Sequence, residues 1–159
     1  MGKRVRQHPV LGRLKWDRDS WEATVELSPG CPIRFAIVAE AEWSDAGPAA
    51  LFEIGAEYVA WARKSESKCR ERIAQDLFGV YNRSWAYEPD DEADDDDPDE
   101  GPPPLTRGEF LKRLRPSGIS LFHTGSADWV YNAGELFAGH GISVYVDESR
   151  VFRKASLFG

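Results

Sequence analysis

The stretch Trp21-Glu22-Ala23-Thr24-Val25-Glu26-Leu27 alternates strictly between apolar and polar side chains. Because successive side chains of a β-strand point to opposite faces, this pattern is typical of a strand with one buried and one solvated face. Turn-forming residues surround it, at 17–20 before it and at 28–30 after it. The stretch therefore predicts the middle strand of an antiparallel meander whose outer strands are residues 10–16 and 31–39.

Helical periodicity follows this meander. Apolar residues recur there at spacings of three and four, which is typical of helices packed along one face. They form two stripes, the first made of Leu51, Gly55, Tyr58, Val59 and Ala62 and the second of Cys69, Ile73, Leu77, Val80 and Tyr81. The pattern fits either two helices or one helix bent near residues 64–67, with Ser44 or Asp45 as the N-cap. Further on, Thr106 and Glu109 have the spacing of a capping box and predict a short helix that ends before Pro116.

Alternation returns in the C-terminal part, where strands are predicted over residues 119–124, 129–131, 142–146 and 151–157. Strands segregated from helices, with short connections between strands, indicate an α+β fold. We expect a mostly antiparallel sheet of about six to seven strands, with two to three helices packed on one face and a disordered acidic loop. The length of 159 residues fits a single domain over residues 1–159.

Charge is distributed unevenly along the chain. The net charge is −7, from 27 acidic and 20 basic residues, and ten of the acidic residues lie between Glu88 and Glu100. Like charges repel, and the prolines that follow block regular hydrogen bonding. We therefore expect an acidic Pro-rich loop insert over residues 86–104, and a basic flexible tail over residues 1–8. The remainder is a near-neutral domain.

Several classes of protein are excluded by composition. No apolar run reaches the roughly 18 residues of a membrane span, and no secretory signal is present. Cys31 and Cys69 lack metal-site spacing and are expected as buried free thiols in a cytoplasmic protein. The three histidines also lack such spacing, and no phosphate-binding loop occurs. We therefore predict no catalytic residue, no metal site and no cofactor, and neither specific nucleic-acid binding nor a membrane partner.

Five short stretches resemble one known family. They are Leu11-Gly12-Arg13-Leu14, Asn82-Arg83-Ser84-Trp85, Phe110-Leu111-Lys112-Arg113-Leu114, Ile119-Ser120-Leu121-Phe122 and Gly134-Glu135-Leu136-Phe137-Ala138-Gly139-His140-Gly141-Ile142. Together they resemble the bacterial domain-of-unknown-function family 2262, over about residues 9–146 of this chain. The acidic run departs from the family pattern and looks like an insert. The family has no established activity, so the resemblance implies no site residues.

The last of these stretches has a physical interpretation of its own. Gly134 and Gly139 supply the positive-φ or close-approach positions of a turn, under which Leu136 and Phe137 pack. Glu135 and His140 are expected to pair across it. Three roles remain open: a rigid corner of the sheet, a partner-recognition loop or a catalytic pair.

Our leading hypothesis is a non-enzymatic protein-binding module that binds a partner with a basic surface. By analogy with small bacterial α+β proteins, it is a candidate immunity-like protein that binds and neutralises a toxin. The candidate partner-binding residues are Trp43, Trp85, Asp94, Asp95, Asp96, Asp97, Glu135, Phe137 and His140. The alternatives are an enzyme of unknown class that uses His140 and Glu135, and a structural or regulatory subunit; the oligomeric state stays open.

Overall fold

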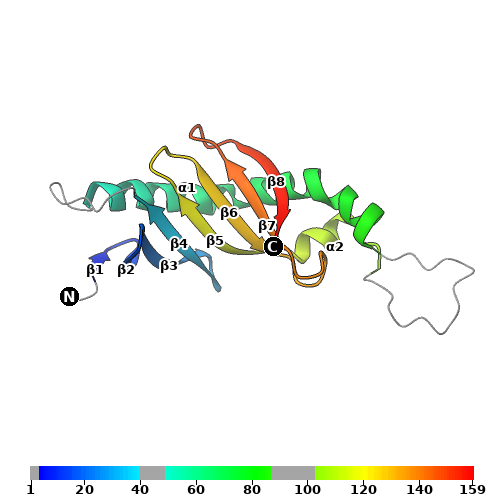
Figure 1. Cartoon of the computed structure of the whole chain (residues 1–159), viewed down its shortest axis with the longest axis horizontal. Coiled ribbons are helices and arrows are strands. Elements are labelled where there is room, and N and C mark those ends of the chain that lie inside the picture. The colour runs from blue at the N-terminus through cyan, green and yellow to red at the C-terminus, as the bar shows by residue number, and fades with distance from the viewer. Residues whose placement is uncertain (1–3, 40–48, 87–102) are drawn as a thin grey trace, which may run out of the picture.

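A computed structural model of the chain describes residues 4–39, 49–86 and 103–159. Its eight strands form one sheet in which spatial order follows sequence order (Figure 1). The strands are β1 (Val5–His8), β2 (Gly12–Asp17), β3 (Ser20–Ser28), β4 (Cys31–Val38), β5 (Arg115–Leu121), β6 (Ala127–Asn132), β7 (Gly141–Val146) and β8 (Phe152–Phe158). Neighbouring strands are antiparallel except β4 and β5, which run parallel. Two four-stranded meanders are thus joined through one parallel pair.

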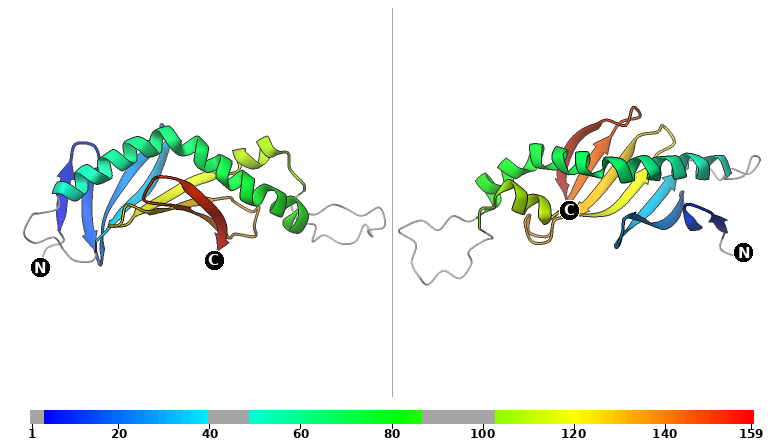
Figure 2. Two further views of the ribbon diagram at one scale, coloured as in Figure 1. Left: turned by 90° about the horizontal axis from the view of Figure 1, so that it is seen from above. Right: turned by 180° about the vertical axis from the view of Figure 1, so that it is seen from behind.

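The helices lie on one face of this sheet (Figure 2). Helix α1 (Ala49–Ile73) continues through the π-helical segments η1 (Ala74–Phe78) and η2 (Tyr81–Trp85), and α2 (Arg107–Lys112) precedes β5. Near its start, the ring of Phe52 meets that of Trp21 in β3 edge-on, with their centroids 5.3 Å apart. At the far end, the carboxylate of Asp76 accepts the backbone N–H of Ala155 in β8, at 2.8 Å. The helix therefore crosses the sheet from the first meander to β8, the last strand of the second meander.

One continuous helix, and not two, accounts for both predicted stripes. The second stripe repeats every fourth residue, through Cys69, Ile73, Leu77 and Tyr81, and all four side chains are buried. A repeat of four exceeds the 3.6 residues of an α-helical turn, so a regular α-helix would rotate these side chains away from the sheet. The wider i→i+5 turns of η1 and η2 keep them on the buried side. No helix in the described ranges is long and apolar enough to cross a membrane.

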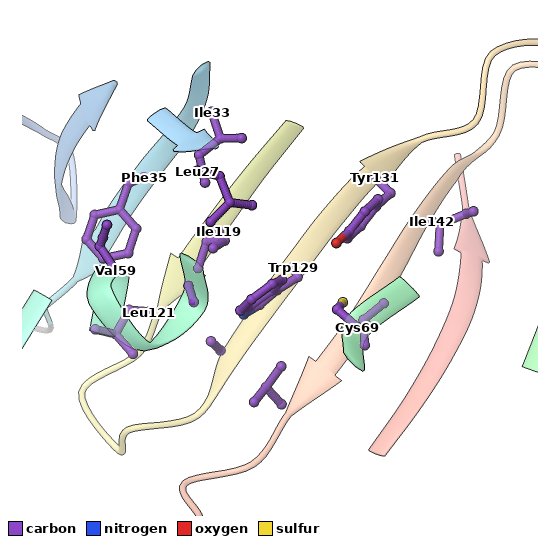
Figure 3. Close-up of a cluster of buried hydrophobic side chains, with 14 of the residues drawn as sticks. Leu27, Ile33, Phe35, Val59, Cys69, Ile119, Leu121, Trp129, Tyr131 and Ile142 are labelled. Carbon is purple, nitrogen blue, oxygen red and sulfur yellow. The ribbon is translucent and has the colours of Figure 1, made fainter. Parts of the chain in front are cut away.

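The core lies between α1 and the sheet (Figure 3). The alternation of the opening stretch is confirmed, since Trp21, Ala23, Val25 and Leu27 are each at most 6% exposed. In the second meander, the indole N–H of the buried Trp129 donates to the hydroxyl of Tyr58 in α1, at 2.9 Å. The predicted α+β class and one-sided helical layer are therefore confirmed.

A polar network links α1 with β6 and α2. The hydroxyl of Tyr131 donates to Glu66 at 3.0 Å, and the guanidinium of Arg70 donates to the same carboxylate at 2.6 Å. Arg70 also donates to the backbone carbonyls of Leu111 and Leu114, at 2.9 and 2.8 Å. Burial raises the pKa of Tyr131 far above its ordinary value, so the phenol remains a hydrogen-bond donor at any physiological pH. The network therefore holds α2 in a defined position against α1.

The first strand was not predicted, and the strand count of six to seven was too low. Residues Val5–His8, expected within the flexible tail, form β1 and pair with β2. Their sequence has no apolar alternation, so only tertiary contacts identify the strand. One such contact joins His8 Nε2 to Glu53 Oε1 of α1, at 2.8 Å. The N-cap candidates Ser44 and Asp45, and residues 87–102 of the acidic insert, lie outside the described residues.

Both cysteines are free thiols, as expected, but only one of them is buried. Cys69 lies in the core, where burial raises its pKa to about 12. Cys31 is partly exposed at the start of β4, so the expectation of two buried thiols was wrong.

We predict that Gly55→Val lowers the free energy of unfolding by about 1–3 kcal/mol, because it overpacks the contact between α1 and β4. A Cβ at Gly55 would already lie 2.6 Å from Cδ1 of Ile37, which is buried. The control is Gly108→Ala in α2, where a Cβ meets nothing within 4 Å. That variant should be neutral or slightly stabilising. Urea denaturation followed by tryptophan fluorescence measures both, and equal stabilities would contradict the close approach.

We also predict that the stability gained from Asp76 depends on pH. Burial acts to raise its pKa, but hydrogen bonds from Arg72 and from the Ala155 N–H outweigh burial, and the pKa is lower than usual. A lowered folded-state pKa adds stability above the unfolded value of about 4, and this stability is lost as pH falls through the folded-state value. Asp76→Asn should therefore cost about 1–2 kcal/mol at pH 7, and the cost should shrink below about pH 4.

Urea denaturation at pH 7 and pH 3 tests this prediction. The matched control is Glu148→Gln, which changes an exposed carboxylate and should alter stability little at either pH. A cost of Asp76→Asn that is the same at both pH values would show that its charge is irrelevant.

Candidate functional site

The turn between β6 and β7 has the predicted internal structure. Gly134 and Gly139 have φ angles of 59° and 85°, in the left-handed region that favours glycine. Leu136 and Phe137 are buried beneath the turn, with 2% and 0% of their surfaces exposed. These features confirm the expected backbone and packing of the family-like stretch.

Three of the sequence-derived candidates meet at this turn. The ring of Trp85, at the end of η2, packs edge-on against Phe137 and His140, with centroids 5.6 and 5.8 Å apart. Tyr81 and Phe110 enclose the other sides of Phe137, at 5.7 and 6.3 Å. Since Phe137 is fully enclosed, it braces the corner between helix and sheet and has no free surface for a partner.

Glu135 and His140 do not form the expected pair. Glu135 is exposed and His140 is partly buried, and no hydrogen bond or ion pair joins these two described residues. The contact with Trp85 holds His140 on the helix side of the turn, whereas Glu135 lines a separate cleft. Of the remaining candidates, Trp43, Asp94, Asp95, Asp96 and Asp97 lie outside the described residues.

The cleft arises where the two meanders join. The parallel ladder between β4 and β5 begins with Arg34 opposite Gly118. Two residues earlier on each strand lie Pro32 and Pro116, and proline has no amide hydrogen to donate. The two strands therefore remain unpaired at this end, and a cavity of about 540 Å³ opens beside them.

Basic side chains dominate this cavity, which we call the basic cleft. Its lining residues are Pro32, Lys112, Arg113, Arg115, Pro116, Ser117, Asn132, Ala133, Gly134 and Glu135. Lys112, Arg113 and Arg115 are exposed, and the side chain of none of the three makes a hydrogen bond or ion pair with the described residues. Glu135 is the single carboxylate in the lining. Among the described residues, the cleft therefore carries an excess of cationic groups over carboxylates.

The wall that carries these cations is rigidly positioned. The capping box of α2 is confirmed, since Thr106 accepts the backbone N–H of Glu109 and the carboxylate of Glu109 accepts that of Thr106. Before α2, the side-chain amide of Asn82 both donates to and accepts from the backbone of Leu105, at 3.0 and 3.1 Å. Together with the Arg70 hydrogen bonds, these contacts fix the short helix against η2 and α1.

Two further hollows are less suited to a ligand. One of about 480 Å³ lies beside β2 to β4, but its Arg34 forms an ion pair with Glu22, which also lowers the pKa of that carboxylate. The other, of about 390 Å³, adjoins Trp61, where Arg150 is stacked over the Tyr58 and Trp61 rings at 5.7 and 5.4 Å. In each hollow at least one lining cation already has a partner, although Arg13 and Lys15 also line the first. Within the described ranges, no three potential metal ligands gather in one place.

The sequence analysis did not identify Lys112, Arg113 and Arg115 as site residues. The sequence feature that could have pointed to them is the stretch Lys112-Arg113-Leu114-Arg115, in which three of four residues are basic. An exposed basic stretch at a helix end is common, so the stretch gains meaning only once Pro32 and the β6–β7 turn are known to face it.

These features define a small α+β domain with two meanders, one crossing helix and a cleft at their junction. The chain belongs to a family of uncharacterised proteins conserved in bacteria, domain of unknown function 2262, whose model matches residues 8–157. No curated protein and no solved structure matches the chain. The match confirms the resemblance found in the sequence and extends to both walls of the cleft.

We predict that the acidic insert is separable from the fold. Asn82 and Tyr81, whose hydroxyl donates to the Pro103 carbonyl at 2.8 Å, hold the chain at residues 103–105, just after the acidic run in sequence. A variant lacking residues 90–100 should therefore melt within about 2 °C of the full chain. Asn82→Ala should cost about 1–3 kcal/mol, because it leaves backbone groups of Leu105 unpaired.

Thermal unfolding followed by circular dichroism measures both changes. The matched control for Asn82→Ala is Ser84→Ala, an exposed position in the same helical segment. Loss of the folded state in the variant lacking residues 90–100 would contradict the prediction.

Proposed function

We propose that this protein is a cytoplasmic protein-binding module that acts in the manner of an immunity protein, by binding and blocking a partner. The observation that carries the proposal is the broad sheet face that the helices leave uncovered, which faces the viewer in Figure 1. Antiparallel sheets commonly expose one face to solvent, so exposed aromatic residues on that face are the informative feature.

Two such residues occur on the last two strands. Tyr145 and Phe158 are each 46% exposed. Their strand neighbours Val144, Val146 and Leu157 point toward the helical layer, so Tyr145 and Phe158 point to the uncovered face. Exposed aromatic side chains on a rigid sheet lose little conformational entropy on binding and are enriched among residues that dominate binding energy. They support protein binding at this face.

The acidic run provides a second argument, from the sequence. Ten carboxylates between Glu88 and Glu100 contrast with the described residues, which hold 19 of the 20 basic and only 14 of the 27 acidic side chains. A strongly acidic segment accelerates association with a basic partner, and salt screens this effect. We therefore propose that the blocked partner has a basic surface.

Site-specific cross-linking tests the proposed face. A photoreactive phenylalanine analogue replaces Tyr145, and a matched control carries it at Ile54, which is 54% exposed on the outer side of α1. In the native bacterium, we expect a single protein to cross-link at position 145 and not at position 54. That protein, once purified, should form a complex that Phe158→Glu weakens at least tenfold, whereas Ile54→Glu leaves it unchanged.

Equal cross-linking at both positions, or equal effects of the two glutamate variants, would refute the proposed face. The association rate should fall between 50 and 500 mM salt, and it should fall further when residues 90–100 are removed. A rate that neither change affects would refute the role of the acidic run.

A further inference from the structure

We infer that the basic cleft receives an acidic peptide segment of the protein partner; this inference rests on the proposed function. The cleft is the largest of the cavities described above, and it lies at the junction of the two meanders. Its occupant is identified by three properties of the lining: unpaired cations, the shape left by two prolines, and the absence of aromatic rings.

The cations of the cleft differ from five other arginines of the described chain. The side chains of those five arginines pair with nearby carboxylates. These pairs are Arg34 with Glu22, Arg70 with Glu66, Arg72 with Asp76, Arg107 with Glu71 and Arg153 with Asp147. By contrast, Arg113 and Arg115 have no carboxylate partner within the described ranges, although both lie on well-held elements. Guanidinium groups bind carboxylates in a planar, two-pronged geometry, so this pair of groups is complementary to acidic side chains.

The size and shape of the cleft favour a peptide segment over a single ion. Its volume of about 540 Å³ lies within the range typical of ligand pockets, about 300–1,000 Å³. Pro32 and Pro116 lack amide hydrogens, so this gap cannot donate the full hydrogen-bond ladder that an added β-strand requires. Recognition must then come from side chains, with Arg113 and Arg115 contacting acidic residues and the proline rings packing against apolar ones.

The same lining argues against single-stranded nucleic acid. Proteins that bind single strands stack bases on aromatic side chains, and no aromatic residue lines the cleft. Glu135, at the turn side of the cleft, would also repel a phosphate backbone. For a peptide, this carboxylate instead sets the direction in which the peptide lies along the cleft. Acidic residues of the peptide are favoured near Arg115 and disfavoured near the turn.

The test uses the full-length protein and a fluorescein-labelled hexapeptide of alternating Asp and Leu. Its binding, measured by fluorescence anisotropy at 50 mM NaCl, should weaken at least tenfold in the double variant Arg113→Glu/Arg115→Glu. The matched control is Lys64→Glu/Lys68→Glu, which makes the same change in net charge on exposed positions of α1 and should weaken binding less than threefold. Glu135→Gln should tighten binding about twofold, and a peptide of alternating Asn and Leu should not bind.

Several outcomes would overturn the inference. Equal losses in the cleft and control variants would show non-specific attraction, and tighter binding of a single-stranded RNA of equal charge would identify a different ligand class. Circular dichroism checks that each variant is folded, and Arg113→Gln/Arg115→Gln should show the same loss in milder form. Tighter peptide binding by a protein that lacks residues 90–100 would support the cleft, provided that the charge reversal still abolishes it.

The inference and the proposed function fail separately. If the partner still cross-links at position 145, and binds with unchanged affinity when Arg113 and Arg115 are reversed, the cleft inference is wrong and the protein-binding function stands. If no partner cross-links at position 145 but the acidic peptide binds the cleft as expected, the proposed sheet face is wrong and the cleft remains a site for acidic ligands.

Discussion

The parallel pairing of β4 with β5 is the constraint on which the rest of the structure depends. Adjacent antiparallel strands need only a tight turn, whereas parallel neighbours need a crossover long enough to return the chain to the same edge. Here α1, η1, η2 and α2 provide that crossover. Since the described helices all belong to this single connection, they lie on one face of the sheet, and the described residues leave the other face uncovered.

A single crossing helix packs against both meanders. Gly55 permits its close approach to β4, and the Trp129–Tyr58 hydrogen bond joins it to β6. At β8, Asp76 accepts a backbone N–H on the free edge of the sheet, where unpaired groups would otherwise invite association with another strand. The helix thus covers the core and also protects part of one edge.

The cleft follows from the same constraint. At the start of the parallel pair, two prolines prevent the ladder from extending, so a gap opens where the meanders meet. The polar network around Arg70 places the end of α2, with its basic residues, beside this gap. A backbone defect and a fixed helix end together produce a charged cavity, while the aromatic packing of Trp85 and Phe137 keeps the neighbouring turn rigid.

Local sequence patterns by themselves determined much of the secondary structure of this protein. The alternation at residues 21–27, the helical stripes, the capping box of Thr106 and the glycines of the β6–β7 turn each act over a few neighbouring residues, and all are present in the structure. The tertiary structure alone decided the strand at Val5–His8, the parallel pairing, the separation of Glu135 from His140 and the convergence of Arg113 and Arg115 with Pro32. The physical reason is that these features depend on contacts between segments far apart in the chain, which no local pattern of residues encodes.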